Sequence, residues 1–183
     1  MLHLRGTPFL LTIKPWRVME TAKRNHLEVR EISGDYRPAT DQEILAAAEK
    51  VINIKFRRGA RIKDPENSKA LFQQKLALQN HEVFAVLFLD AQHRVIEYRE
   101  LFHGSIASAP VHPRLIAKQA LDLNAAAVIV AHNHPSGEIE PSRQDIDLTK
   151  RLKKALSLVD VNLLDHLIIG SVNSFSFVER SYL

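Results

Sequence analysis

The sequence has 183 residues, of which 45% are hydrophobic and 25% are charged, and these values are typical of a globular protein with one sizeable core. It contains no cysteine, which excludes disulfides, thiolate metal sites and cysteine nucleophiles. The longest apolar runs, 83–89 and 125–131, are too short to cross a bilayer, and the start lacks a signal-peptide pattern. We therefore expect a soluble, cytoplasmic protein in which only His, Asp or Glu can bind a metal.

The formal net charge of +4 comes from the N-terminal third of the chain. Residues 1–69 contain 14 Lys and Arg against 9 Asp and Glu, whereas the remaining residues contain 11 against 12. The densest basic segment, 55–63, has five basic residues in nine and could contact DNA phosphates through counterion release. The alternative, which we favour, is a solvated linker between two structural elements.

Residues 1–40 show no sustained hydrophobic period and contain scattered Pro and Gly, so we expect a loosely structured extension there. Residues 41–56 repeat apolar side chains at helical spacing after Asp41, a candidate N-cap. This helix should bury one face, made of Ile44, Leu45, Ala48, Val51 and Ile52. With the basic segment it completes a predicted N-terminal region, 1–61, before a main domain at 62–183.

The main domain is predicted to alternate helices and strands. Helices are expected at 64–80, 112–124 and 142–159, and strands at 82–90, 94–102, 126–132, 161–170 and 174–179. The first two strands are joined by three residues and predict an antiparallel hairpin; the first is apolar on both faces and should be central. The pattern indicates an α/β (α+β) fold with a mixed β-sheet flanked by helices.

The segment AHNHPSGEIEPSRQD, 131–145, contains the candidate metal ligands. In extended backbone His132 and His134 point to the same side, while Asn133 faces away. Two such histidines alone are more often ordinary polar side chains on the surface. Asp145, in the first turn of the next helix, can however fold back beside them. His, His and Asp leave a fourth tetrahedral position for water, which is the arrangement of a catalytic zinc site.

Hydrolysis at such a site needs further residues. Ser142, three residues before Asp145, is either a helix N-cap or an oxyanion-stabilising hydroxyl, and the local sequence favours the cap. A proton carrier is also needed, and Glu82 stands out because it opens a strand expected to be buried, where a carboxylate is costly without a task or a partner. The other candidates are Glu97, Glu100, Glu138 and Glu140.

The spacing of His132, His134, Ser142 and Asp145 resembles the JAMM motif, H-x-H-x7-S-x2-D, of the JAB/MPN metalloenzymes. More closely, the segments 82–106, 124–152 and 158–170 resemble the RadC family of bacterial JAB-domain proteins. The resemblance covers residues 62–183. Four functional positions must keep their spacing together for the motif to occur, so it is a specific signal.

The resemblance implies a JAB/MPN (cytidine deaminase-like) architecture with one Zn²⁺ per chain, held by His132, His134 and Asp145. It also implies a glutamate on an early strand as the general acid and base, which matches Glu82, and it assigns Ser142 to the oxyanion. Longer family members carry an N-terminal helix-hairpin-helix, which residues 1–61 lack. The short members are the nearer resemblance, and this puts in question the DNA-repair role attached to the family.

The leading hypothesis is zinc-dependent hydrolysis of an amide, peptide or isopeptide bond in a peptide or protein substrate. One alternative is a DNA-associated protein in which the zinc site is structural or vestigial and the basic segment binds DNA. Another is a metal-dependent nuclease, because a zinc hydroxide can also attack phosphodiesters. Asp165 and His166, at the start of a late strand, either support the metal ligands or form a satisfied pair at the end of a strand. The sequence does not define the substrate or the oligomeric state.

Overall fold

The computed structural model describes residues 11–12, 27–31, 34–55, 57–104 and 111–183. The chain divides into two compact units, Met1–Val51 and Ile52–Leu183. In the first unit β1 (Leu11–Thr12), β2 (Glu28–Arg30) and β3 (Tyr36–Pro38) form a three-stranded antiparallel sheet. The expected loose extension is therefore wrong for these strands, because two or three residues are too few to show an alternating pattern. The remainder of that expectation lies largely outside the described residues.

Helix α1 (Asp41–Lys55) matches its prediction in length, but its cap lies one residue earlier. The hydroxyl of Thr40 accepts from the backbone N–H of Glu43, and the Glu43 carboxylate accepts from the backbone N–H of Thr40, at 3.3 and 2.9 Å. This reciprocal pair is a capping box with Thr40, not Asp41, as the N-cap. Leu45, Ala48 and Val51, expected to face inward, are exposed.

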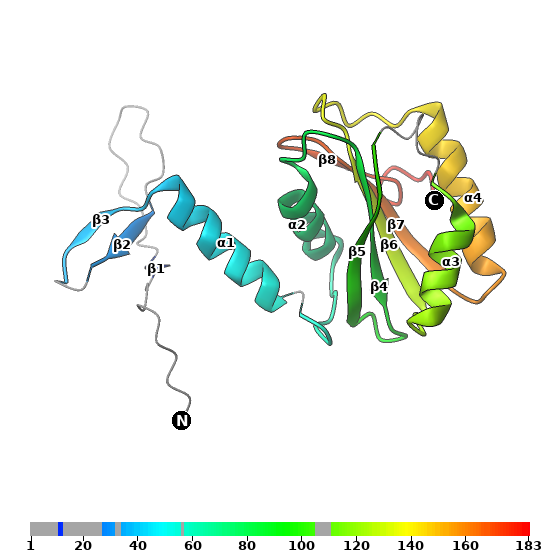
Figure 1. Ribbon diagram of the computed structural model, residues 1–183, viewed down its shortest axis with the longest axis horizontal. Coiled ribbons are helices and arrows are strands. Elements are labelled where there is room, and N and C mark those ends of the chain that lie inside the picture. The colour runs from blue at the N-terminus through cyan, green and yellow to red at the C-terminus, as the bar shows by residue number, and fades with distance from the viewer. Residues whose placement is uncertain (1–10, 13–26, 32–33, 56, 105–110) are drawn as a thin grey trace. The chain divides into compact units, whose positions relative to one another are not determined.

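The second unit is built on a five-stranded mixed sheet with the order β5-β4-β6-β7-β8, in which only β6 and β7 are parallel (Figure 1). The predicted α/β fold is confirmed. Its strands are β4 (Val83–Leu89), β5 (Val95–His103), β6 (Ala127–Asn133), β7 (Asn162–Ile169) and β8 (Ser174–Ser176). The helices that follow α1 along the chain all lie in this unit: α2 (Pro65–Leu76), α3 (Pro113–Asp122) and α4 (Arg143–Ser157).

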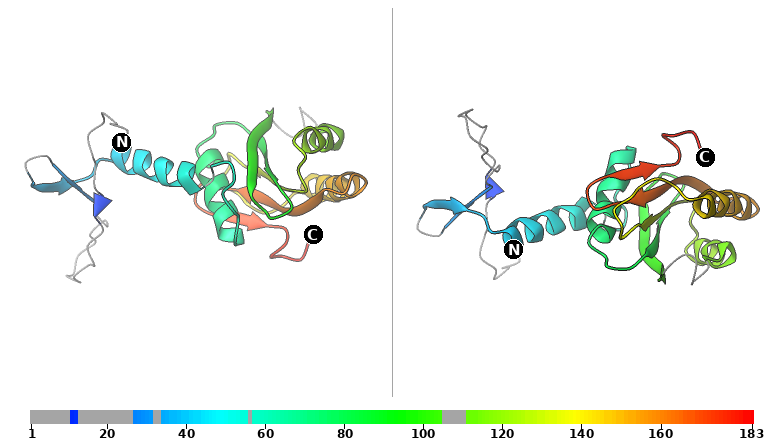
Figure 2. Two further views of the ribbon diagram at one scale, coloured as in Figure 1. Left: turned by 90° about the horizontal axis from the view of Figure 1, so that it is seen from below. Right: turned by 90° about the horizontal axis from the view of Figure 1, so that it is seen from above.

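Helix α2 covers one face of this sheet, and α3 and α4 cover the other (Figures 1 and 2). Every residue of β4 is buried, as expected for a strand that is apolar on both sides. Ala85 and Leu87 belong to the core under α2, whereas Val86 and Phe88 belong to the core under α3 and α4. The continuous apolar run of β4 thus follows from its place between two helical layers.

The crossover from β6 through α4 to the parallel strand β7 determines where the candidate ligands meet. Leu148, Leu152 and Leu156, one helical turn apart, are buried under α4 as the sequence predicts. Packing of this stripe sets the first turn of α4 beside the end of β6 from which the chain leaves the sheet (Figure 1). Residues 132–134 and the start of α4 therefore lie together.

The basic segment is more than a solvated linker, because residues 59–62 pair with the start of β5. The backbone N–H of Gly59 donates to the carbonyl of Val95 at 2.7 Å, and the N–H of Val95 donates to the carbonyl of Ala60 at 2.7 Å. Ile62 is buried in the core under α2. The cations on this segment are exposed, and among the described residues none of their side chains makes a hydrogen bond or ion pair: Arg57, Arg58, Arg61 and Lys63.

Candidate metal centre

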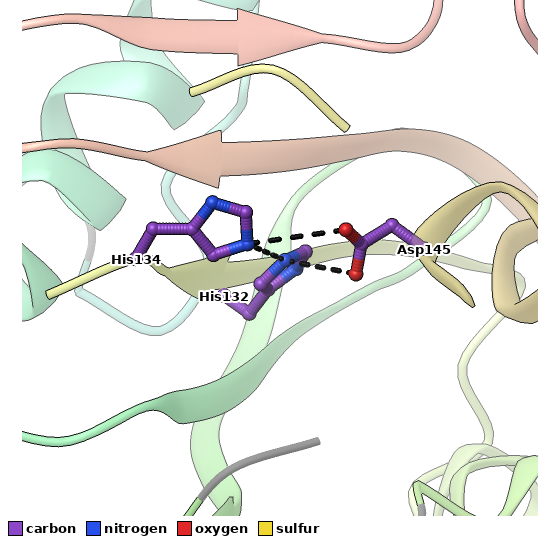
Figure 3. A group of neighbouring side chains, drawn as sticks. All are labelled: His132, His134 and Asp145. Carbon is purple, nitrogen blue, oxygen red and sulfur yellow. Dashed lines mark hydrogen bonds and ion pairs between the residues drawn. The ribbon is translucent and has the colours of Figure 1, made fainter. Parts of the chain in front are cut away.

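The structure brings His132, His134 and Asp145 together at the end of β6 (Figure 3). Nε2 of His132 is 3.1 Å from Nε2 of His134 and 3.2 Å from Oδ1 of Asp145, and Nε2 of His134 is 3.9 Å from Oδ2 of Asp145. His132 is 0% exposed and Asp145 is 1% exposed, whereas His134 is half-buried. Three metal-binding side chains thus converge from a strand and a helix that the fold holds rigidly.

The separations between these atoms can be compared with the size of a zinc ion. Zinc–nitrogen and zinc–oxygen bonds of about 2.0–2.2 Å at tetrahedral angles place neighbouring ligand atoms about 3.4 Å apart. The observed values of 3.1, 3.2 and 3.9 Å lie on both sides of this distance. The donor set, two imidazoles and one carboxylate, also suits zinc and leaves one coordination position open.

His134 is held in the tautomer that can bind a metal. Its Nδ1 lies 2.7 Å from the backbone carbonyl oxygen of Glu138. Because a carbonyl oxygen only accepts, Nδ1 must carry the hydrogen, and in the neutral ring Nε2 then carries a lone pair. The loop that supplies this carbonyl turns at Gly137, whose φ of 82° favours glycine.

Asp145 is tied to Ser142 by the capping box that the sequence predicted. The hydroxyl of Ser142 accepts from the backbone N–H of Asp145 at 3.2 Å and donates to its Oδ2 at 2.6 Å. Burial acts to raise the pKa of Asp145, but hydrogen bonding and charge from His132, with hydrogen bonds from Ser142, hold that pKa well below its usual value. Asp145 is therefore ionised, and it accepts the hydroxyl hydrogen of Ser142.

Glu82 lies one residue before β4 and is half-buried, so the expectation that it would be buried is wrong. Its carboxylate is not among the three converging groups. Phe84, two residues further on, pairs with His132 across the β4–β6 ladder. The backbone of Glu82 therefore lies near the edge of the sheet where the three side chains converge.

The other candidate carboxylates have different surroundings. Glu97 forms an ion pair with Arg99 at 2.8 Å, and Glu100 accepts a hydrogen bond from Tyr98 at 3.1 Å. Glu138 and Glu140 are exposed in the loop after His134, as expected for solvated side chains. The loop contributes to the site through the backbone of Glu138 instead.

Asn133, between the two histidines, was not singled out in the sequence. It is 2% exposed and faces away from the ligands, as the alternation predicted. Its Oδ1 accepts from the backbone N–H of Val83 at 2.7 Å, and its Nδ2 donates to the carbonyl of His81 at 3.0 Å. These bonds hold the backbone on both sides of Glu82, so the ligand strand also positions the candidate proton carrier.

Behind His132 lie further polar residues, one of which, Thr149, the sequence gave no reason to select. His166 is 2.9 Å from His132 and 2.6 Å from Thr149. Complete burial, and then the charge of His132, lower the pKa of His166 well below its usual value. By contrast, Asp165 accepts bonds from Ser176 and from backbone N–H groups, and burial raises its pKa. Asp165 is thus a satisfied structural acid, whereas His166 contacts the ligands.

The fold and the converging side chains define an α/β domain with a His/His/Asp group that is compatible with a metal site. Residues 62–182 match the family model of the RadC-like JAB domain. The chain therefore belongs to the RadC family, as the sequence motifs suggested.

Several bacterial relatives are similar to this chain. A UPF0758 protein of Marinobacter nauticus is 46% identical over 166 residues, which cover 91% of this chain and 74% of the relative. A UPF0758 protein of Vibrio cholerae is 50% identical over 145 residues, 79% of this chain and 91% of the relative. A UPF0758 protein of Xylella fastidiosa is 55% identical over 128 residues, 70% of this chain and 57% of the relative.

The Marinobacter alignment is longer than the domain at 62–182, so it includes part of the N-terminal region as well. No helix in the described part of the chain is long and apolar enough to pass through a membrane.

Proposed function

We propose that this protein is a zinc-dependent hydrolase that cleaves an amide bond in a peptide or protein. The observation that carries the proposal is the convergence of two imidazole nitrogens and one ionised carboxylate, separated by 3.1, 3.2 and 3.9 Å, at the buried end of a strand. Three ligands with one open position are the composition of a catalytic rather than a structural zinc site. Membership of the JAB-domain family supports the same class of reaction.

The resemblance to the JAMM motif suggests the role of each residue. When bound, zinc lowers the pKa of a coordinated water to about 7 and polarises a carbonyl group. Glu82 takes a proton from the attacking water and delivers it to the leaving nitrogen. The Ser142 hydroxyl, after rotating away from Oδ2 of Asp145, donates a hydrogen bond to the carbonyl oxygen under attack.

Metal analysis of the purified protein tests the site. The parent and Glu82→Gln should contain about one zinc per chain, because neither changes a ligand, whereas His134→Ala and Asp145→Ala should contain little. Circular dichroism on each variant checks that it is folded. Zinc retained by both ligand variants, or a parent that binds none when zinc is supplied, would overturn the assignment.

The class of substrate needs a separate comparison. Parent and Glu82→Gln protein should be incubated with a peptide library and with single- and double-stranded DNA, and the products analysed by mass spectrometry. Peptide cleavage that disappears in Glu82→Gln is the expected result. Phosphodiester cleavage that disappears in the same variant would replace the peptidase assignment with a nuclease.

A second candidate function is DNA binding, which four exposed cations without hydrogen-bond or ion-pair partners among the described residues favour: Arg57, Arg58, Arg61 and Lys63. If each contacts one phosphate, log K against log salt has a slope near −0.9 per contact, so replacing all four by Gln should make the slope less steep by about 3 to 4. Fluorescence anisotropy with a labelled duplex measures this slope. His134→Ala is the control, because it leaves the basic segment unchanged.

A further inference from the structure

A line of buried hydrogen bonds leads from His132 away from the metal centre and ends on the backbone of another ligand. Nδ1 of His132 is 2.9 Å from Nε2 of His166, and Nδ1 of His166 is 2.6 Å from Oγ1 of Thr149. Oγ1 of Thr149 is in turn 2.7 Å from the backbone carbonyl oxygen of Asp145. His132 and His166 are 0% exposed and Thr149 is 2% exposed, so these groups depend on one another for partners.

The direction of every bond follows from the carbonyl at the end. A carbonyl oxygen only accepts, so the single hydroxyl hydrogen of Thr149 must point to Asp145. Thr149 can then only accept from Nδ1–H of His166, which leaves a lone pair on Nε2 of His166. That lone pair accepts from Nδ1–H of His132, so Nε2, which lies 3.2 Å from Oδ1 of Asp145, is the nitrogen of His132 that remains for a metal.

The rings in this line have little freedom to turn. Phe84 stacks on His132 with an angle of 9° between the ring planes, and Phe177 stacks on His166 at 15° with a centroid distance of 4.7 Å. Because these contacts restrain both imidazole planes, the placement of the hydrogen atoms becomes the main variable. The hydroxyl of Thr149 determines that placement.

We propose that His166 and Thr149 are positioning residues that hold His132 in its metal-binding tautomer before any metal arrives. The inference rests on the proposed metal centre and extends it, because neither residue is a ligand. The line also joins two ligands: it starts at the ring of His132 and ends on the first turn of α4, which carries Asp145. The same geometry therefore couples the tautomer of one ligand to the placement of another.

Thr149→Val removes the hydroxyl group and keeps the shape of the side chain. Without the hydroxyl, Nδ1–H of His166 has no acceptor in the line, so His166 moves its hydrogen to Nε2 and donates to Nδ1 of His132. His132 then carries its hydrogen on Nε2, where the metal should bind. Thr149→Ser is the matched control, because it keeps the hydroxyl and removes only a methyl group.

The test combines imidazole ¹⁵N NMR of the zinc-free proteins at about pH 8.5 with zinc affinity measured by competition against a chelating dye. The parent and Thr149→Ser should show His132 protonated on Nδ1 and bind zinc equally. Thr149→Val should show His132 protonated on Nε2 and bind zinc about 10- to 100-fold more weakly. A purely structural role for Thr149 would lower the melting temperature without moving the tautomer.

The outcomes distinguish this inference from the proposed function. A parent with no hydrogen on Nδ1 of His132, or a Thr149→Val protein with parental zinc affinity, overturns the proposed role of His166 and Thr149 even if zinc is bound. A parent that binds no zinc overturns the proposed function, while the NMR result still shows whether His166 and Thr149 fix the hydrogen of His132. If Thr149→Val does not fold, the tautomer of the zinc-free parent decides the question alone.

Discussion

Each of the three candidate ligands makes further contacts that orient its side chain. Nδ1 of His134 bonds to the carbonyl of Glu138, and Nδ1 of His132 bonds to His166. Asp145 receives bonds from the backbone and the hydroxyl of Ser142. Such supporting contacts reduce the disorder that a metal would have to overcome, so their loss should weaken metal binding even when all ligands remain.

Asn133 tests whether the ligand strand also positions Glu82. In Asn133→Ala the backbone N–H of Val83 and the carbonyl of His81 lose their side-chain partner. An unsatisfied buried group costs about 1–3 kcal/mol, so urea unfolding should show a loss of that order or slightly more. Zinc content should stay at the parent level, while hydrogen exchange at Val83 becomes faster and substrate turnover falls.

The neighbouring Asn80 provides a control for this change. Asn80 lies in the same loop before β4 but is exposed, so Asn80→Ala should leave stability within about 0.5 kcal/mol of the parent. Unchanged exchange at Val83 in Asn133→Ala would show that the amide does not hold this loop. Loss of zinc in Asn133→Ala would show instead that it supports the ligands directly.

Ser142 can be tested for its two roles by comparing Gly with Ala. Removing an N-cap hydroxyl costs about 1 kcal/mol with Ala but only a few tenths with Gly, so Ser142→Gly should remain almost as stable as the parent. Both changes remove the hydroxyl, and loss of an oxyanion donor lowers turnover about 10²- to 10³-fold. Thermal unfolding and turnover on the substrate identified by the library check these effects; parental turnover in Ser142→Gly would restrict Ser142 to capping.

The residues that sequence could predict are those with a fixed local spacing. His132, His134 and Asp145 are recognisable because the H-x-H pair lies at the end of one strand and the acid lies in the first turn of the next helix. Thr149 and His166 could not be found in this way, because their contact depends on how α4 packs on β7. The burial of Glu82 was mispredicted because the strand begins one residue later than expected.

At the scale of elements, Gly170 allows the loop after His134 to lie against the end of β7. A Cβ atom at this position would be 2.7 Å from the carbonyl oxygen of Gly137 and 2.8 Å from Ile139. Gly170→Ala should therefore push residues 137–139 away and lengthen the bond between Glu138 and His134. We expect a lower melting temperature and weaker zinc binding, measured by calorimetry and dye competition.

Gly59→Ala is the matched control for Gly170→Ala. Its φ of 85° means that Ala costs about 1–2 kcal/mol in backbone strain, but no atom lies within 4 Å of the added Cβ. Gly59→Ala should thus lower stability without changing zinc affinity. Equal zinc affinities in Gly170→Ala and the parent would mean that the loop adjusts without moving the Glu138 carbonyl.

Elements with a strong internal period were predictable, and those defined by pairing were not. The stripe of Leu148, Leu152 and Leu156 predicts α4, and the apolar run of β4 predicts a central strand. The short strands β1 to β3 and the pairing of residues 59–62 with β5 depend on partners far along the chain. Backbone pairing of this kind leaves no pattern in the side chains of three or four residues.

At the scale of the whole molecule, the two compact units meet at 51/52, whereas the family match begins at residue 62. Within this difference, residues 52–55 belong to α1, and Gly59 and Ala60 pair with Val95 of β5 by backbone hydrogen bonds. We keep 62–183 as the proposed metal-binding domain and 1–61 as the proposed N-terminal region. The exposed cations of 57–63 lie in the second unit, which also contains His132, His134 and Asp145.

Zinc binding should couple the stability of this unit to pH. A ligand that binds only the folded state adds RT ln(1 + [L]/Kd), so zinc at 100 times its Kd raises the free energy of unfolding by about 2.7 kcal/mol. Histidine binds zinc through an unprotonated ring nitrogen, so protons compete with zinc for this site. The stability added by zinc is therefore lost as the pH falls. Melting temperatures with zinc and with EDTA should differ clearly at pH 7.5 and converge towards pH 5. His134→Ala should show little difference at either pH. A difference that persists in this variant would mean that zinc binds elsewhere.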